Sequence, residues 1–128
     1  MQTRPVHPTD GIYPASRDYI HAMEVSGVQK LLFVAGTMGL DEAGAAPASL
    51  DEQLVLIWKN IRRILAAAEM STDNIVRLTS YLREPAYAGP NAKARAAALG
   101  GRQIPTTAIV VQTLETDWLV EIEVIAAA

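Results

Sequence analysis

The spacing of apolar residues along the chain predicts two helices and five strands. Ser49, followed three residues later by Glu52, is typical of a helix start, and apolar residues then recur every three or four positions. We therefore expect a helix over 50–69, with Gln53 and several basic residues on its polar face. The alanine-rich stretch 91–99 predicts a second helix. Runs rich in β-branched and apolar residues predict strands over 19–27, 31–36, 74–82, 105–114 and 119–127.

Turn-forming residues separate these elements. The first 18 residues are rich in Pro, Ser and Asp, and they predict a loop or an edge segment laid over the domain. The short interval between the first two strands suits an antiparallel hairpin. A four-residue loop over 115–118 joins the last two strands and predicts a second hairpin. The Gly/Ala/Pro stretch 37–48 predicts a longer irregular loop.

The order of elements indicates an α+β fold in which two helices cover one face of a single mixed sheet. The chain has 128 residues, half of them hydrophobic, which is the size of one domain over 1–128. The second sheet face has no helix to cover it, although its strands carry Ile, Val and Leu on both sides. Packing against copies of itself would bury this face, so we expect a homo-oligomer.

Composition narrows the classes of function. The formal net charge of −3 disfavours nucleic acid as a partner, and the absence of cysteine excludes a thiolate nucleophile and Cys-based metal sites. His7 and His21 lack metal-ligand spacing, and no glycine loop has Walker or Rossmann spacing. We expect no metal and no cofactor. Without a signal peptide or an apolar stretch of roughly 20 residues, we expect a cytoplasmic protein with no membrane contact.

Two carboxylates interrupt the apolar last strand. Strand alternation places Glu121 and Glu123 on one face, and Val120, Ile122 and Val124 on the other. One interpretation is a solvated acidic face, or glutamates that pair with basic residues across a subunit boundary. The other is a general acid or base located where subunits meet. The pattern alone leaves both interpretations open.

A set of short motifs runs in a fixed order through most of the chain. They are Tyr19, "LLFVAGTMGLD" (31–41), "AAAEMSTDNIVRLTSYL" (66–82), Asn91, Pro105 and "VEIEVIA" (120–126). In order and spacing, these motifs resemble the Rid/YjgF family, the reactive-intermediate (enamine/imine) deaminases also known as L-PSP endoribonucleases.

The resemblance implies a chorismate-mutase-like fold of the bacillary type, assembled as a homotrimeric barrel with ligand clefts between subunits. It also implies that Glu121 is the acid that orients water, with Glu123 as a structural companion. Backbone amides near Gly36 and Ile109 would hold substrate oxygen. The substrate-binding residues that the resemblance implies are Tyr19, Gly36, Thr37, Asn91, Thr107 and Ile109.

The chain departs from the family at Thr107, where deaminating members carry an arginine that binds the carboxylate of a 2-imino acid. A hydroxyl supplies neither the charge nor the paired hydrogen bonds of a guanidinium. Arg102 and Arg83 are candidate substitutes, although a solvated surface role suits each of them. Trp118 fits either the rim of a cleft or a packing anchor.

Two functions follow from these residues. The first is hydrolysis of an enamine, imine or related compound to a carbonyl and ammonia by a water that Glu121 orients, with a substrate altered by the loss of the arginine. The second is a non-catalytic, ligand-binding or chaperone-like trimer. Endoribonuclease activity is disfavoured, because the chain lacks a basic aromatic groove for RNA.

Overall fold

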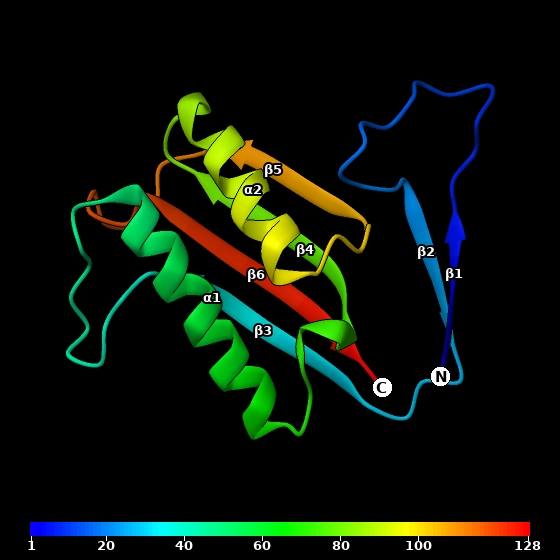
Figure 1. Cartoon of the computed structure of the whole chain (residues 1–128), viewed down its shortest axis with the longest axis horizontal. Helices are drawn as coiled ribbons and strands as arrows, with labels where there is room; N and C mark the ends of the chain where they lie inside the picture. Colours follow the sequence, from blue (N-terminus) through cyan, green and yellow to red (C-terminus); the bar gives the residue numbers. More distant parts are fainter.

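The computed structural model describes all 128 residues, and a four-stranded mixed sheet forms its main layer (Figure 1). The strands lie in the order β3 (Leu31–Met38), β6 (Val120–Ala127), β4 (Ile75–Leu82) and β5 (Thr106–Val110). β6 is antiparallel to β3 and to β4, whereas β4 and β5 are parallel. The predicted mixed sheet is therefore confirmed.

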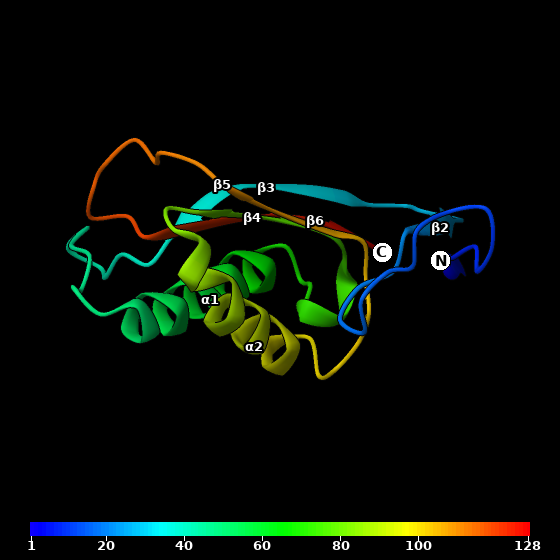
Figure 2. The same cartoon turned by 90° about the horizontal axis from the view of Figure 1, so that it is seen from above.

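Both helices lie on the same face of this sheet, as the view from above shows (Figure 2). They are α1 (Leu50–Ala67) and α2 (Ala88–Ala98), and short 3₁₀ turns at Thr72–Asn74 and Pro85–Tyr87 precede β4 and α2. α2 begins earlier than predicted because Pro90 falls in its first turn, where a missing N–H costs no hydrogen bond. The α+β fold with two helices on one face is confirmed. No helix of the chain has the length and apolar character needed to cross a membrane.

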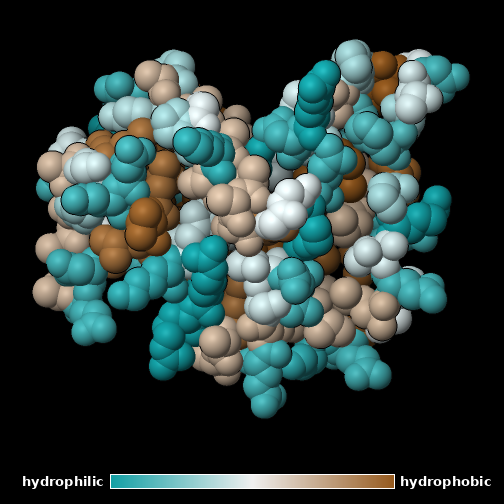
Figure 3. Space-filling model, in the orientation of Figure 1, coloured by the Kyte–Doolittle hydropathy of each residue, from teal (hydrophilic) through white to brown (hydrophobic).

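The apolar face of α1 packs on the sheet and forms the core. Ser49 accepts a hydrogen bond from the backbone N–H of Glu52, as the helix-start pattern predicts. Beyond this cap, the side chains that α1 and the strands bury together include Leu54, Ile57, Trp58, Ile61, Leu65, Leu78, Leu82, Ile122 and Val124. Figure 3 shows the opposite, outer side of the helix layer, where hydrophilic side chains project from many points.

Gln53 is buried, so its predicted place on the polar face of α1 is wrong. The side chain is 1% exposed. Its Nε2 donates to the carbonyl oxygens of Pro47 and Asp117, and its Oε1 accepts from the backbone N–H of Leu119. These three bonds satisfy the amide, which is why a polar side chain is stable there.

The N-terminal residues form a separate two-stranded sheet beside the main layer (Figure 1). β1 (Gln2–Val6) pairs antiparallel with β2 (Ala22–Ser26). Of the two predictions for 1–18, the loop is wrong for β1, and the edge segment is right in that β1 is an edge strand, although of a separate sheet. The predicted hairpin over 19–36 is wrong, because β2 pairs with β1. After β2, Lys30 donates its backbone N–H to the carbonyl oxygen of Ala128. The next strand, β3, therefore pairs with β6 and not with β2.

The last two strands do not form the predicted hairpin, because β4 lies between them. β5 runs parallel to β4, so the segment 111–119 must cross the end of β4 to reach β6. Val111 donates its backbone N–H to Leu82, and Arg83 Nη1 donates to the carbonyl oxygens of Thr113 and Glu115. These bonds hold the crossing segment against the end of β4.

Candidate functional site

Glu121 and Glu123 project from β6 on the sheet face that the helices leave uncovered. Val120 and Ile122 are 0% exposed, whereas both glutamates are only partly buried. The predicted alternation of β6 is therefore confirmed. On β4, Tyr81 lies opposite Glu121. The two carboxylates thus lie on a surface that a ligand or a second copy can reach.

Tyr81 fixes the second of these carboxylates. Its hydroxyl donates a hydrogen bond of 2.5 Å to Glu123 Oε1. This bond raises the pKa of Tyr81 above its ordinary value of 10.0. Burial and the negative charges of Glu123 and Glu121 raise the pKa further, whereas the positive charge of Arg77 lowers it. Tyr81 therefore stays protonated at neutral pH and holds Glu123 in a fixed position.

Glu121, in contrast, receives no hydrogen bond from another side chain of the chain. Burial is the main cause that raises the pKa of Glu121, and the negative charge of Glu123 raises it further. A carboxylate with a raised pKa and free oxygens is suited to take a proton from water and to return it. Of the two glutamates, Glu121 has the properties of a general acid or base.

Gly36 leaves the space that the Glu121 carboxylate occupies. The pairing of β3 with β6 is irregular between Val34 and Thr37, which leaves Gly36 within a bulge. A Cβ atom built on Gly36 would lie 2.7 Å from Glu121 Oε2. The structure therefore brings together Gly36 and Glu121, two of the site residues that the resemblance implies.

Thr107 and Ile109 extend this face onto β5. Ile109 is paired in register with Tyr81, and Thr107 is paired with Thr79 of β4. The hydroxyl of Thr107 accepts a hydrogen bond of 2.7 Å from Arg77 Nη2. A cation therefore lies directly beside Thr107, the position at which the resemblance implies an arginine in deaminating members.

The motifs do not single out Arg77, although alternation along 74–82 places it on one face with Thr79 and Tyr81. Its closeness to Thr107 depends on the parallel register of β4 and β5, which the sequence pattern does not contain. Arg77 and Tyr81 are the site residues whose identification required the structure.

The two arginines proposed from the sequence as substitutes have other partners. Arg102 Nη2 donates to the carbonyl oxygens of Thr72 and Ile75. Arg83 Nη1 donates to Thr113, through both its hydroxyl and its carbonyl oxygen. Both guanidinium groups therefore anchor backbone, Arg102 at the start of β4 and Arg83 in the segment after β5.

Three of the implied substrate-binding residues do not share the sheet face of Glu121 within one chain. Thr37 is 9% exposed and pairs with Ile122 on the core side of the sheet. Asn91 is 1% exposed on α2, in the helix layer. Tyr19 precedes Ile20, whose backbone N–H donates to Ile104 ahead of β5, and its ring is edge-on to His21 with centroids 6.1 Å apart.

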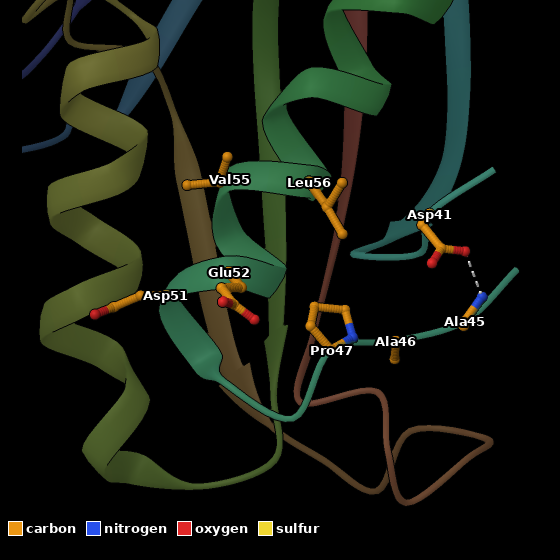
Figure 4. A pocket seen from close by; sticks show the side chains of 8 residues that line it. All are labelled: Asp41, Ala45, Ala46, Pro47, Asp51, Glu52, Val55 and Leu56. Atoms are coloured by element: carbon orange, nitrogen blue, oxygen red, sulfur yellow. Dashed lines mark hydrogen bonds between the residues drawn. The ribbon is translucent and has the colours of Figure 1, made fainter. Parts of the chain in front are cut away.

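Three cavities of the single chain lie in the helix layer, and Glu121 lines none of them. One, of about 530 Å³, is formed by the loop before α1 and the first turns of that helix (Figure 4). Its Asp41 is engaged by the loop, since Asp41 Oδ1 accepts from the backbone N–H groups of Ala43 and Ala45. Another, of about 650 Å³, lies between α1 and α2. The sheet face is the candidate site, because the paired carboxylates and the shifted pKa of Glu121 are found there.

The chain also contains no group of three or more His, Asp or Glu side chains that could hold a metal ion. The polar groups described on the sheet face are the two carboxylates, the Tyr81 hydroxyl and the pair formed by Arg77 and Thr107.

The sequence model of the family described as Endoribonuclease L-PSP matches residues 12–128. A RutC family protein of Aquifex aeolicus (strain VF5) is 36% identical over 67 residues, which cover 52% of this chain and 51% of that protein. The RutC family protein YjgH of Escherichia coli (strain K12) is 31% identical over 78 residues, 58% of this chain and 60% of that protein. The matches thus span between half and two thirds of these curated relatives.

Among solved structures, the fold matches YyfB of Yersinia pestis, a protein of unknown function in the conserved Rid family. The TM-score is 0.81 at 22% identity, and the match covers the whole of both chains. At this identity the likeness establishes a common fold.

Proposed function

The chain belongs to the Endoribonuclease L-PSP (Rid/YjgF) family, and we propose that it hydrolyses a small imine or enamine on the sheet face that carries Glu121. The observation that carries this proposal is the state of the Glu121 carboxylate. It is partly buried, free of side-chain hydrogen bonds, raised in pKa and set against the backbone at Gly36. Its neighbour Glu123 accepts the hydrogen bond of Tyr81, so Glu121 is the glutamate of the pair with no side-chain donor on either oxygen.

The reaction needs one carboxylate and one water. The imine nitrogen first takes a proton from solvent. Ionised Glu121 then takes a proton from the water as the water oxygen bonds to the carbon of the protonated C=N bond, and the electron pair of that bond moves to nitrogen. Glu121 returns its proton to the nitrogen of the resulting carbinolamine, the C–N bond breaks and ammonia leaves, while the hydroxyl gives its proton back to solvent and forms the carbonyl.

A second copy of the chain would complete the site. Phe33 and Leu31 are 71% and 55% exposed on the same sheet face, so a single chain leaves this face open to water. Packing of copies in a homotrimer would cover these apolar groups and turn the face into clefts for a small molecule. Tyr19 would then contribute from a neighbouring copy, and the nearly buried Asn91 would support α2 without touching the substrate.

The alternative is a non-catalytic trimer that binds a small molecule. The presence of Thr107 in place of the family arginine favours this function, because the neutral hydroxyl weakens the contact to a carboxylate substrate. In that case Glu121 would be dispensable. RNA cleavage is not favoured, because the face carries two carboxylates and the chain has a net charge of −3.

The test is ammonia release from imines generated in situ by an amino-acid oxidase, over a panel of side chains. We expect Glu121→Gln to lower kcat/KM by about 100-fold or more, the usual range for loss of a general acid or base. Glu42→Gln, a change of the same kind in an exposed loop, should leave the rate unchanged. A wild-type rate no higher than that in buffer, or full activity in Glu121→Gln, would exclude the hydrolase and favour the binding protein.

A further inference from the structure

We propose that Arg77 binds the carboxylate of the substrate together with Thr107, so that β4 supplies the cation that β5 lacks. The inference rests on the proposed function, since it assigns a ligand to the same face. It names a specificity-determining residue that the family resemblance does not point to.

Arg77 is the basic side chain among the strand residues of this face. Along β4 it alternates with Thr79 and Tyr81, and it pairs in register with Ile125 of β6. The two ion pairs of the chain, Arg4 with Glu24 and Arg95 with Asp18, involve neither Arg77 nor the carboxylates of β6. The charge of Arg77 is therefore not neutralised by a partner in the chain.

The hydrogen bond to Thr107 positions the guanidinium without using up its donors. Arg77 Nη2 donates to Thr107 Oγ1 at 2.7 Å, and this is the one side-chain hydrogen bond that Arg77 makes. A guanidinium has five N–H donors, and a hydroxyl that accepts one bond can still donate its own proton. Arg77 and Thr107 thus present N–H and O–H groups side by side, an arrangement suited to the two oxygens of a carboxylate.

The separation from Glu121 limits the size of the ligand. Thr107 lies in register with Glu123, which is two residues, or about 6.6 Å, from Glu121 along the strand direction. Across the sheet, Thr107 and Glu121 are separated by two strand spacings, or about 9.6 Å. The backbone positions are therefore roughly 12 Å apart, and the hydrogen-bonded side chains of Tyr81 and Glu123 occupy the positions between them. This distance suits a small ligand in which the imine carbon lies close to the carboxylate.

Binding of a stable carboxylate tests the inference without requiring turnover. We would titrate the full-length protein with pyruvate and, as the neutral match, with pyruvamide, following both by NMR. We expect Arg77→Gln to weaken pyruvate binding by about 30-fold or more and to leave pyruvamide unchanged. Arg63→Gln, which removes a charge from the exposed face of α1, should bind both compounds like the wild type.

Two further variants separate an effect on the ligand from an effect on folding. Thr107→Val removes only the hydroxyl and should weaken pyruvate binding by about threefold to tenfold. Arg77→Gln combined with Thr107→Arg should restore binding, because it places a guanidinium on the neighbouring strand. Pyruvate binding that is unchanged in Arg77→Gln, or no tighter than pyruvamide binding in the wild type, would overturn the inference.

The outcomes also separate this inference from the proposed hydrolysis. If pyruvate binding depends on Arg77 but no imine is hydrolysed, the hydrolase proposal fails and the role of Arg77 stands. If ammonia release depends on Glu121 but is the same in Arg77→Gln, the hydrolase proposal stands and the role of Arg77 is wrong.

Discussion

At the scale of single residues, the two glutamates of β6 differ in what their neighbours do to them. Glu123 receives the Tyr81 hydroxyl, whereas Glu121 is partly buried and faces the charge of Glu123 without a donor. Ionising Glu121 therefore costs more free energy in the folded chain than in the unfolded chain. This cost is compatible with catalysis because a general base is more effective when its pKa is closer to the working pH.

The raised pKa of Glu121 has a consequence for stability. Between its ordinary pKa of 4.5 and the higher value in the folded state, the folded chain binds more protons than the unfolded chain, so the free energy of unfolding falls as pH rises. Glu121→Gln cannot ionise and avoids this loss. We expect its Tm to exceed that of the wild type at pH 7, and the difference to shrink as the pH falls toward 4.5 and to be absent below it.

Thermal melts from pH 4 to pH 8 would measure this difference. Glu42→Gln, on an exposed loop, is the matched control and should show no such dependence. A wild type that is more stable than Glu121→Gln at pH 7 would mean that a group outside the chain stabilises the carboxylate.

Two glycines, Gly36 in β3 and Gly39 in the loop after it, exclude a side chain for different reasons, the first functional and the second structural. A Cβ on Gly36 would meet the Glu121 carboxylate, the end of a flexible side chain, whereas a Cβ on Gly39 would lie 2.4 Å from the backbone oxygen of Gln53. We expect Gly36→Ala to fold with a loss of less than about 1 kcal/mol and to lower kcat/KM by about tenfold or more, since misplacing a catalytic group is costly.

Gly39→Ala should instead lower the free energy of unfolding by about 2–3 kcal/mol, because backbone must move to admit the methyl group. Urea denaturation and the ammonia assay on the same samples would distinguish the two effects. Wild-type activity in Gly36→Ala would show that the carboxylate can leave Gly36 without harm, and the proposed geometry would then be wrong.

At the scale of elements, Gln53 links α1 to the segments on either side of it. Its Nε2 donates hydrogen bonds to the loop at Pro47 and to the crossing segment at Asp117, and its Oε1 accepts one from the backbone N–H of Leu119, just before β6. The start of β6, and with it Glu121, is thereby tied to the first turn of the helix. A polar residue in a helical repeat predicts a solvated position, and only the tertiary contacts explain its burial.

Gln53→Met should therefore destabilise the chain, although the new side chain has a similar volume. Removing the amide leaves two carbonyl oxygens and one N–H without their partner, and we expect a loss of about 2–4 kcal/mol. Lys59→Met, on the exposed face of the same helix, should change the free energy of unfolding by less than about 0.5 kcal/mol. Urea denaturation at one fixed protein concentration would compare them, and equal stabilities would show that the bonds of Gln53 contribute nothing.

The elements that sequence patterns predicted best are those with a strong local signal. α1 begins after its Ser49 cap and β6 alternates as its residues require, because capping and strand periodicity are local properties. Pairing is not local, and both predicted hairpins were wrong. A short loop allows adjacent strands to pair, but the chain gains more by placing the apolar β6 between β3 and β4, where it is hydrogen-bonded on both sides.

At the scale of the whole molecule, the non-local pairing of strands also explains why the sequence predicted only part of the candidate site. The family motifs pointed to Glu121 and Gly36, which the structure places in contact. They did not point to Arg77, because its contact with Thr107 follows from the register of two strands about 30 residues apart. Tyr19 and Asn91 do not share the sheet face of Glu121 in one chain, so any part they take in the cleft depends on how copies assemble.

Assembly is therefore the last condition for the proposed function, and the uncovered sheet face allows it to be tested. Phe33 is 71% exposed on this face, and Val55 is 69% exposed on the helix side. If copies pack through the sheet face, Phe33→Asp should dissociate the assembly to the 13.8 kDa chain and abolish ammonia release, because charge is not tolerated in an apolar interface. Val55→Asp should remain assembled and active.

Light scattering coupled to size exclusion would give the masses, with three chains of 13.8 kDa amounting to about 41 kDa. A wild-type protein of 13.8 kDa would contradict the assembly and the intersubunit cleft. A monomeric Phe33→Asp that hydrolyses imines at the wild-type rate would have a different meaning. Glu121, Gly36 and Arg77 would then form a complete site within one chain, and the exposed face would serve association alone.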